Sequence, residues 1–372
     1  MELGSKLYYR SDSIACRRDS LFAVTPCRRG LAAGLATLGL LAAGCSARSS
    51  GTASSSRGTA NLAAAGSLEG VIQTRLQPAF ESTTKDSVVT KFAGSGALTE
   101  MVKDGEIDPG VFLSIGAGPI EALFPHRCRY VMTLATDPLV LAYSPRSRYA
   151  PQLNAIKDGQ KPFKDLFTLL EQPGFRLGRT DPVVDPQGGY FILMLRLAER
   201  VYRLPTGTAA RILGATGSNP IGSSTQIVDE NALATEIASG TFDAGSDFLT
   251  EARQYHLDYI RLPPSIDFAD PAELSRYASV TLRLSGGEPL RGGLITLDDT
   301  FVLAPRDQPR SRANRAADEA FLAFLLSKAG RRTLAGAGYS LEKPRISYAA
   351  GYSRPSSVLA PSVLRQYRRL QG

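Results

Sequence analysis

Short apolar runs typical of strands alternate with longer apolar runs at helical spacing along most of the chain. Positions 68, 71, 72 and 76, for example, are all apolar and share one face of a helix. This pattern predicts helices at 63–77, 95–105, 190–204, 229–240 and 313–338. It predicts strands at 86–94, 110–116, 138–145, 175–181, 258–263, 280–286, 292–297 and 301–305. The alternation favours an α/β protein with mainly parallel sheets.

Small polar or acidic residues stand at four predicted helix starts. They are Ser67, Ser95, Asp185 and the neighbours Asp229 and Glu230. Helix capping would explain any one of them, since Ser and Asp are favoured caps. Ligands of open α/β sheets, however, bind where strands end and helices begin, and the free N–H groups there attract anions. With two serine hydroxyls as further donors, the set as a whole predicts a site for a small oxyanion.

The segment GRTDPVVDPQGGY holds two Asp-Pro pairs and a glycine pair. Pro186 suits the first position of a helix, where its missing N–H costs nothing. We expect Asp181 to end a strand, Asp185 to begin the helix, and Gly188 and Gly189 to let the backbone approach a ligand. The pattern leaves open whether the Asp185 carboxylate caps its own helix or reaches the ligand.

Catalytic chemistry has little support in the sequence. The two histidines, His126 and His256, have no second His or Cys at metal-ligand spacing. No nucleophile elbow, phosphate-binding loop or dinucleotide-binding glycine motif is present. Asp181 and Asp185 could form a hydrolase pair, but the chain has no tryptophan for a sugar platform. We therefore expect no enzymatic activity and no cofactor, with an exported enzyme on a bilobal fold as the rival hypothesis.

The N-terminal segment has the order of parts of a secretory signal. Arg28 and Arg29 precede the apolar run GLAAGLATLGLLAAG, and Cys45 follows it directly. A cysteine after LAAG resembles the lipobox of bacterial lipoproteins, in which that cysteine is lipidated. We expect a signal peptide at 1–44, lipidation of Cys45, a flexible tether at 45–60, and anchoring to the outer face of the bacterial cell membrane. The alternative is a short buried helix with a chance cysteine.

Loss of the predicted signal changes the cysteine count and the charge. Besides Cys45, only Cys128 would remain, which predicts a buried, unreactive thiol and no disulfide. The whole chain has a net charge of +8, of which residues 1–44 supply +3, so the mature chain has +5. No basic run is interleaved with aromatic residues, so no nucleic-acid partner is indicated. No stretch is apolar enough for a permanent membrane span.

Several motifs, in order from residue 61 to the end, resemble the substrate-binding proteins of molybdate/tungstate ABC importers. AAAGSL and FAGSGAL resemble the two serine loops of that family, and GRTDPVVDPQGGY resembles its acidic turn. DENALATEIASG and GAGYSLEKPRIS resemble later segments, and the most similar branch is the archaeal tungstate/molybdate one. The resemblance implies a periplasmic-binding-protein-like type II fold, with two α/β lobes joined by two crossover strands. Lobe 1 would comprise 61–138 and 265–372, and lobe 2 would comprise 139–264.

The resemblance also implies ligand-binding residues on both lobes. Ser67 and Ser95 would supply hydroxyls and backbone N–H groups from lobe 1. Gln187 would supply its backbone N–H from lobe 2. Asp185 and Glu230 would be the two carboxylates that approach the metal atom of the oxyanion.

At one position the match to the family has two alternatives, and at two others the chain departs from the family pattern. Asp229 is the alternative to Glu230, because the alignment could shift by one residue there. Phe248 stands where the family often has a tyrosine that closes the site, so a hydroxyl donor is missing. The acid that the family has after VFLS is also missing, since Ile115 occupies that position.

Two carboxylates beside an anion restrict its chemistry. A carboxylate repels a nearby dianion, unless the anion shares a proton with it, as monohydrogen phosphate can, or has a large metal atom that accepts further oxygen ligands. Sulfate does neither, whereas molybdate and tungstate do the second. If Asp185 and Glu230 both face the site, a molybdenum or tungsten oxyanion is favoured. The resemblance then implies a binding protein that delivers this anion to an ABC permease, and we expect it to be a monomer. The alternative is a binding protein for phosphate, sulfate or a small organic acid.

Overall fold

The fold is known from a computed structural model, in which residues 57–216, 219, 221–284 and 289–372 are described. The predicted signal peptide, Cys45 and most of the predicted tether lie outside these residues. All of the described residues belong to one compact unit. In these ranges no helix combines the length and the apolar character needed to cross a membrane.

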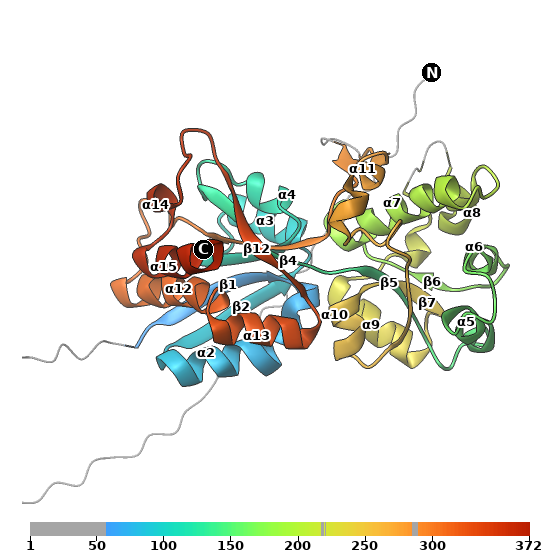
Figure 1. Ribbon diagram of the computed structural model, residues 1–372, viewed down its shortest axis with the longest axis horizontal. Helices are drawn as coiled ribbons and strands as arrows, with labels where there is room; N and C mark the ends of the chain where they lie inside the picture. Colours follow the sequence, from blue (N-terminus) through green and yellow to red (C-terminus); the bar gives the residue numbers. More distant parts are fainter. Residues whose placement is uncertain (1–56, 217–218, 220, 285–288) are drawn as a thin grey trace, which may run out of the picture. The chain divides into compact units, whose positions relative to one another are not determined.

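The larger sheet has six strands in the order β12–β4–β11–β3–β1–β2 (Figure 1). They are β1 (Thr59–Ala65), β2 (Ser87–Ala93), β3 (Val111–Ile115), β4 (Tyr130–Thr136), β11 (Thr296–Phe301) and β12 (Ser340–Tyr348). β1 is parallel to β2 and β3, whereas β11 is antiparallel to β3 and β4, and β12 to β4. The prediction of mainly parallel sheets is wrong here, because the chain returns from the second lobe as β11 in the opposite direction.

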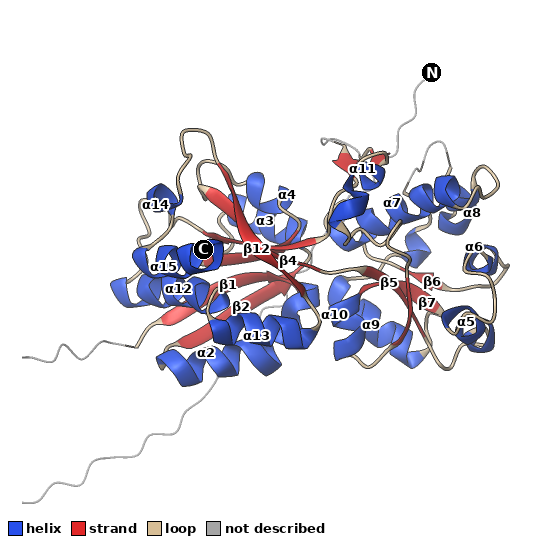
Figure 2. Ribbon diagram, in the orientation of Figure 1, coloured by secondary structure: helices blue, strands red, loops and turns tan. Residues whose placement is uncertain are grey.

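Helices cover both faces of this sheet (Figure 2). Alternation along the strands places Ala63 and Phe112 in one core with α3 and α4. Leu62 and Ala64 lie in another core, which includes α2 and α12. The helical segments of this lobe are η1 (Gly66–Leu68), α1 (Glu69–Val71), η2 (Ile72–Leu76), α2 (Gln77–Thr84), α3 (Ser95–Lys103), α4 (Gly118–Glu121), α12 (Arg312–Leu325), α13 (Lys328–Ala337), α14 (Pro355–Val358) and α15 (Pro361–Gln371).

The second sheet has four strands in the order β6–β7–β5–β8, which are β5 (Leu139–Tyr143), β6 (Leu177–Gly178), β7 (Ala244–Phe248) and β8 (Asp258–Arg261). Val140 and Ala142 pack with Leu233 of α9 and Leu249 of α10, whereas Leu141 faces the larger core that contains α7. The helices are α5 (Ala150–Lys157), α6 (Asp165–Leu170), α7 (Pro186–Val201), α8 (Thr208–Leu213), η3 (Ser224–Gln226), α9 (Glu230–Ser239) and α10 (Leu249–Gln254).

Two connections join the lobes. Asp137 and Pro138 lead from β4 into β5, and residues 292–295 lead into β11. Before this return come η4 (Pro271–Glu273), α11 (Leu274–Tyr277), and the antiparallel pair β9 (Thr281–Leu282) and β10 (Leu290–Arg291). β9 packs on α7, where Arg196 Nη1 donates to the Thr281 carbonyl at 2.7 Å. Part of the segment predicted for lobe 1 therefore contacts lobe 2.

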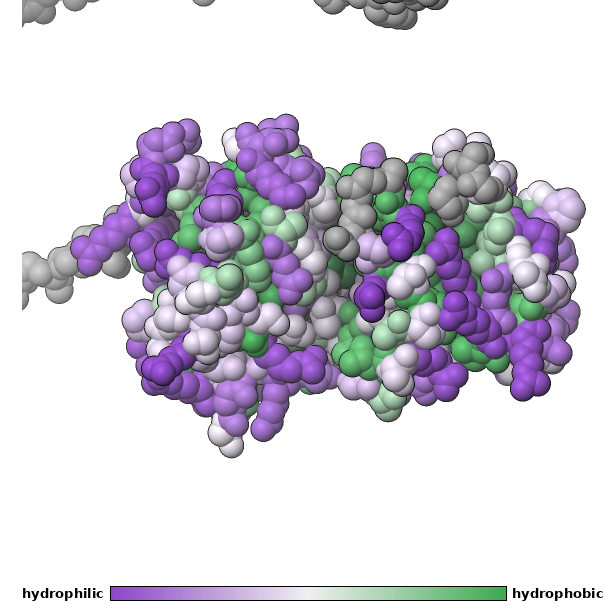
Figure 3. All heavy atoms as spheres, turned by 90° about the horizontal axis from the view of Figure 1, so that it is seen from above, coloured by the Kyte–Doolittle hydropathy of each residue, from purple (hydrophilic) through white to green (hydrophobic). Residues whose placement is uncertain are grey.

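The two-lobed α/β architecture of a periplasmic-binding-protein-like type II fold is confirmed. Each lobe has its own sheet with helices on both faces (Figure 2). In the view from above, hydrophilic side chains are spread over both lobes, with hydrophobic patches between them (Figure 3).

Several element boundaries differ from the prediction. The helix predicted at 313–338 is two helices, because the Ser327 hydroxyl accepts a hydrogen bond from the Gly330 amide (3.1 Å) and starts α13. The strands predicted at 292–297 and 301–305 are one strand, β11, and residues 63–65 end β1. The pattern misses β4 and β7, since both are buried along nearly their whole length and lack alternation.

Candidate ligand-binding site

The start of the first helical segment lies opposite Glu230. β1 ends at Ala65 and the backbone turns into η1, so the N–H groups of Gly66 and Ser67 have no helical partners. Glu230, from the start of α9 on the other lobe, accepts from both: Oε2 lies 2.8 Å from Gly66 N, and Oε1 lies 3.0 Å from Ser67 N. The Ser67 hydroxyl is buried and has no partner among the described residues. A helix start of lobe 1 thus binds a carboxylate of lobe 2 as it would bind an oxyanion.

Glu230 and its neighbour Asp229 differ in environment. Glu230 is 6% exposed, whereas Asp229 is exposed and makes no side-chain cap. Burial, followed by the charges of Asp185 and Glu251, raises the pKa of Glu230 well above its usual value. The Ser67 amide acts in the opposite direction, because it binds the ionised form. Of the two alternatives, Glu230 has the buried side chain that reaches across the cleft.

The Asp185 carboxylate uses its two oxygens differently. Oδ1 accepts from Gln187 N at 2.9 Å, which makes Asp185 the N-cap of α7, with Pro186 at the first helical position. Oδ2 is buried and accepts no hydrogen bond within the described part of the chain. Burial raises the pKa of Asp185 to about 6. One oxygen therefore caps the helix, and the other is left for a ligand.

Gln187 is placed by both its backbone and its side chain. Its amide N–H, predicted to serve the ligand, donates to Asp185 in this structure. Its side-chain Nε2 donates to Glu251 Oε2 at 3.3 Å. Its Oε1 is buried and unpartnered in the described ranges.

A backbone carbonyl of lobe 2 accepts hydrogen bonds from the free amides at the start of α3. The Ser95 hydroxyl accepts from the Ile115 amide at 3.1 Å, so it is held by the end of β3. The next two amides, of Gly96 and Ala97, donate to the Val184 carbonyl at 3.0 and 3.2 Å. A Cβ atom at Gly96 would lie 2.8 Å from that oxygen, so glycine allows the close approach.

Gly188 and Gly189 of the acidic turn allow close packing against other parts of this protein. A Cβ atom at Gly188 would lie 2.2 Å from the Thr180 carbonyl oxygen. At Gly189 it would lie 2.6 Å from the side chain of Leu290. The two glycines therefore pack the start of α7 against the preceding turn and β10, which differs from the predicted approach to a ligand.

A cavity of about 690 Å³ opens between these elements. Gly94 and Ala97 line it from lobe 1, and Thr180, Asp185 and Glu230 line it from lobe 2. No lysine or arginine of the described residues lines it. Attraction for an anion would therefore come from backbone N–H groups and hydroxyls.

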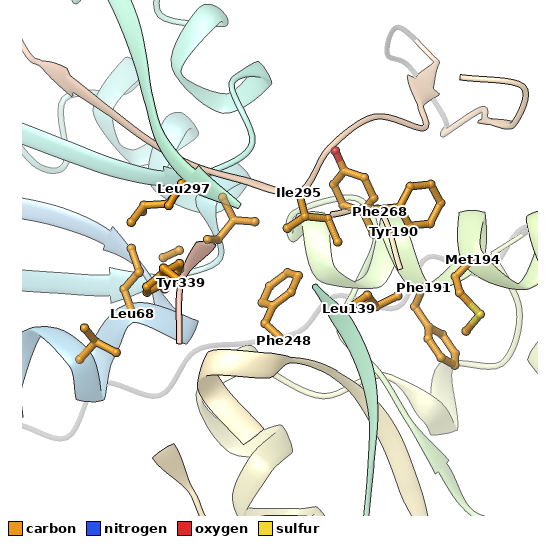
Figure 4. Close-up of a cluster of buried hydrophobic side chains, with 14 of the residues drawn as sticks. Leu68, Leu139, Tyr190, Phe191, Met194, Phe248, Phe268, Ile295, Leu297 and Tyr339 are labelled. Carbon is orange, nitrogen blue, oxygen red and sulfur yellow. The ribbon is translucent and has the colours of Figure 1, made fainter. Parts of the chain in front are cut away.

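Phe248 lies away from this cavity, in the hydrophobic core. Its ring is fully buried, with Leu139 to its right and Ile295 above it in Figure 4. Tyr339, which the sequence analysis misses, does not line the cavity either, but its hydroxyl is buried and has no partner among the described residues. Burial, followed by the charge of Asp137, raises the pKa of Tyr339 well above its usual value. No local signal in GAGYSL marks this residue.

Three further carboxyl groups are buried but do not line the cavity, at Asp137, Asp247 and Glu251. Asp137 accepts from the amide and the hydroxyl of Thr250. Glu251 accepts from the Gln187 side chain, and Asp247 accepts from the Phe248 amide. Burial raises the pKa of Asp137 and of Asp247 to about 7, and that of Glu251 well above its usual value. The three follow β4 or lie where β7 passes into α10, so the strand-end rule could have located them.

The sequence-predicted residues are therefore brought together only in part. Asp185 and Glu230 line one cavity, and Ser67 meets Glu230 directly. Gln187 is joined to this group through Asp185 and Glu251, whereas Phe248 is in the core. Within the described ranges no group of three or more His, Cys, Asp or Glu residues has the arrangement of a metal-ion site.

Comparison with known proteins defines the class to which this two-lobed fold and cleft belong. The profile of the family described as bacterial extracellular solute-binding protein matches residues 60–340. This range runs from β1 to Tyr339 and includes the whole sheet of lobe 2. The chain therefore belongs to the bacterial extracellular solute-binding protein family.

Individual relatives are identical to this chain at about a quarter of the aligned positions. An uncharacterized solute-binding protein of Halobacterium salinarum is 24% identical over 266 residues, which are 71% of this chain and 79% of the relative. The molybdate/tungstate-binding protein WtpA of Pyrococcus abyssi is 26% identical over 225 residues, 57% of this chain and 62% of the relative. WtpA of Thermococcus kodakarensis is 24% identical over 229 residues, 57% of this chain and 60% of the relative.

Solved structures with a similar chain path include oxyanion-binding proteins. The periplasmic molybdate-binding protein of Azotobacter vinelandii has a TM-score of 0.48 and 20% identity, covering 76% of this chain and 99% of that one. The sulfate-binding protein SubI of Mycobacterium tuberculosis has a TM-score of 0.45 and 12% identity, covering 76% and 86%. Similarity at this level does not discriminate between ligands.

Proposed function

We propose that this protein captures molybdate or tungstate in the cleft between its lobes and delivers the oxyanion to the permease of an ABC transporter. The observation that carries the proposal is the binding of the Glu230 carboxylate by the amides of Gly66 and Ser67. These donors come from the opposite lobe, so closure around a negatively charged oxygen group is built into the cleft. Relatives named as molybdate/tungstate-binding proteins support the ligand class.

In the proposed complex, oxygens of the ligand replace the Glu230 carboxylate at the two amides. The unpartnered Ser67 hydroxyl provides a further donor. Glu230 is then free to approach the central atom, together with Oδ2 of Asp185, which has no partner among the described residues. Molybdenum and tungsten accept such additional oxygen ligands, whereas the sulfur of sulfate does not. The two carboxylates would therefore favour a metal oxyanion over sulfate.

A second candidate ligand is a smaller anion such as phosphate. The observation that favours it is the set of buried carboxyl groups with raised pKa values, Asp185 and Glu230 included. A carboxyl group that keeps its proton donates a hydrogen bond, so it would not repel an ordinary oxyanion. The chemistry of the cleft is that of ligand capture in both cases, without a proposed catalytic step.

Isothermal titration calorimetry with molybdate, tungstate, sulfate and phosphate tests the choice. We expect either metal oxyanion to bind at least about 100-fold more tightly than sulfate, a difference near 3 kcal/mol. Tight binding of phosphate without binding of molybdate or tungstate would replace the first candidate by the second. Absence of binding to all four anions would overturn both.

We also propose export and anchoring through lipidated Cys45. The family description, extracellular solute-binding protein, supports export, and the order of basic, apolar and cysteine residues supports lipidation. Metabolic labelling with a radioactive fatty acid in a bacterial host tests this step. The chain should incorporate the label, and Cys45→Ser should abolish incorporation; labelling of the variant would disprove the assignment.

A further inference from the structure

Positive charge is concentrated in the last part of the chain. Residues 306–372 contain thirteen Lys/Arg and four Asp/Glu, a net charge of +9. Residues 57–305 contain 23 Lys/Arg and 28 Asp/Glu, a net charge of −5. The small surplus of the whole chain conceals this asymmetry, because the two parts largely cancel.

Seven of the eleven exposed cations of this part lie on α13, β12 and α15, and β12 contacts both helices (Figure 1). Arg369 Nη2 of α15 donates to the Leu326 carbonyl just before α13, at 3.4 Å. Gln371 Nε2 donates to the Pro344 carbonyl of β12 at 2.6 Å. We define the basic face of lobe 1 by the exposed residues Lys328 and Arg332 of α13 and Arg365, Arg368 and Arg369 of α15. Lys343 and Arg345 of β12 are not included, because Ile346 and Tyr348 pack on the core beside α15, so residues 343 and 345 point to the other side of the sheet.

The charges of the basic face are not neutralised by neighbours. None of its residues forms a salt bridge within the described part of the chain. Glu342 is the one acidic residue in α13, β12 and α15 together. On α15 the arginines at 365, 368 and 369 share one side, while Leu364, Tyr367 and Leu370 pack on the core. Basic amphipathic helices of this kind are typical of surfaces that meet anionic membranes.

The N-terminal segment joins lobe 1 at α12, which packs against α13 and α15. Thr59 N donates to Asn314 Oδ1 in the first turn of α12, at 3.1 Å. A Cβ atom at Gly58 would lie 2.2 Å from the Ala313 carbonyl oxygen, so the chain enters in direct contact with this helix. If lipidated Cys45 anchors the protein, as proposed above, the same lobe is the one held near the lipid headgroups.

We propose that the basic face of lobe 1 binds the surface of an anionic membrane, with phospholipid headgroups as its ligands. Clustered Lys and Arg residues are attracted additively to anionic lipid, over a range set by the Debye length of about 10 Å at 0.1 M salt. None of the five residues lines the cleft cavity. The proposal therefore does not depend on which solute the cleft binds.

Sedimentation with lipid vesicles tests the proposal on the full chain. Neutral phosphatidylcholine vesicles report any contribution of the N-terminal apolar segment, and vesicles with roughly one third phosphatidylglycerol add the electrostatic part. We expect at least about tenfold tighter binding to the anionic vesicles at roughly 0.05 M salt, lost at roughly 0.5 M. The combined Arg365→Gln, Arg368→Gln and Arg369→Gln variant should lose this preference.

A matched variant removes the same charge from exposed sites elsewhere, as Lys91→Gln, Lys161→Gln and Lys164→Gln. It should keep the preference for anionic vesicles. Equal binding of the wild type to both vesicle types, or equal losses in both variants, would overturn the proposal. So would binding to heparin that needs the same three arginines while anionic vesicles do not bind. If the arginine variant unfolds, Lys328→Gln with Arg332→Gln on α13 provides the same comparison.

Discussion

Glu230 Oε1 lies 3.0 Å from the amide nitrogen of Ser67 on the opposite lobe, and both residues are buried. The second carboxylate oxygen is bound by Gly66 in the same way. The donors of one helix start are therefore occupied by an acid of the protein itself. A ligand of this cleft has to displace the Glu230 carboxylate from the amides of Gly66 and Ser67. The displaced carboxylate can then contact the ligand.

Replacing Glu230 separates these two effects. Glu230→Gln removes the negative charge that would approach a metal atom, so the affinity for molybdate should fall by about ten- to a hundredfold. The affinity for sulfate should not fall, because sulfate gains nothing from the carboxylate. Asp229→Asn, at the exposed neighbouring position, is the control and should change neither affinity in calorimetry. A loss in Asp229→Asn with none in Glu230→Gln would contradict the assignment.

Asp185 can be tested as a cap and as a ligand independently. Asp185→Asn keeps a good N-cap and loses the charge, so stability should be retained while molybdate affinity falls. Asp185→Ala should also lose about 1 kcal/mol of unfolding free energy, because the bond to Gln187 N disappears. Urea unfolding and calorimetry measure the two quantities.

The control for the capping effect is Ser311→Ala at the start of α12, where the hydroxyl accepts from Asn314 N at 3.1 Å. This variant should lose a similar unfolding free energy and keep its affinity. Full molybdate affinity in Asp185→Asn would show that the carboxylate is only a cap.

Gly96 allows the lobes to meet at Val184. A methyl group there would lie 2.8 Å from the Val184 carbonyl oxygen, so Gly96→Ala should disfavour closure and weaken ligand binding by about tenfold, close to 1.4 kcal/mol. Unfolding of the free protein should change less, because the clash can be relieved by opening of the cleft. Gly118→Ala, where a Cβ atom meets nothing within 4 Å, is the matched control. Equal affinities in the two variants would argue against closure at this contact.

The buried acids predict how stability depends on pH. Burial raises the pKa of Asp185 to about 6 and those of Asp137 and Asp247 to about 7, compared with about 4 in an unfolded chain. Between these values the folded state binds more protons than the unfolded state, so the contribution of these groups to stability falls as pH rises. It is fully present below about pH 4 and lost by about pH 7 to 8.

Thermal unfolding between these pH values measures this contribution. Asp247→Asn should flatten the decline of the melting temperature, whereas Asp104→Asn, at an exposed position of lobe 1, should leave it unchanged. A steeper decline in Asp247→Asn would be inconsistent with a raised pKa at this group.

Tyr339 has a buried hydroxyl without a partner among the described residues. If the hydroxyl donates to the bound oxyanion, Tyr339→Phe should lower ligand affinity by about tenfold, a loss near that of one hydrogen bond. The stability of the free protein should not fall, since no hydrogen bond within the described chain is removed. Tyr190→Phe is the control, because the Tyr190 hydroxyl donates to the Leu294 carbonyl at 3.2 Å. The control should lose stability and keep affinity; unchanged affinity in Tyr339→Phe would remove this residue from the site.

Local patterns in the sequence were sufficient to predict much of the secondary structure. The start of α7 is encoded by adjacent residues, Asp185 as cap and Pro186 at the first helical position. The starts of α3 at Ser95 and of α9 at Glu230 were also predicted, although neither helix has a side-chain cap. The division of one long predicted helix by Ser327 was missed, because the apolar spacing continues across the break.

The sequence by itself determined the α/β class and the start of α7, because these depend on the order of the elements and on hydrogen bonds between near neighbours. The resemblance of its motifs to a known family implied the two-lobed fold. Only the tertiary structure decided which helix starts meet. Ser67 and Glu230 are 163 positions apart and come into contact when the two lobes face each other. The burial of Asp137, Asp247 and Tyr339 around them has the same origin. No local pattern records it, since it depends on where the crossovers place the second lobe against the first.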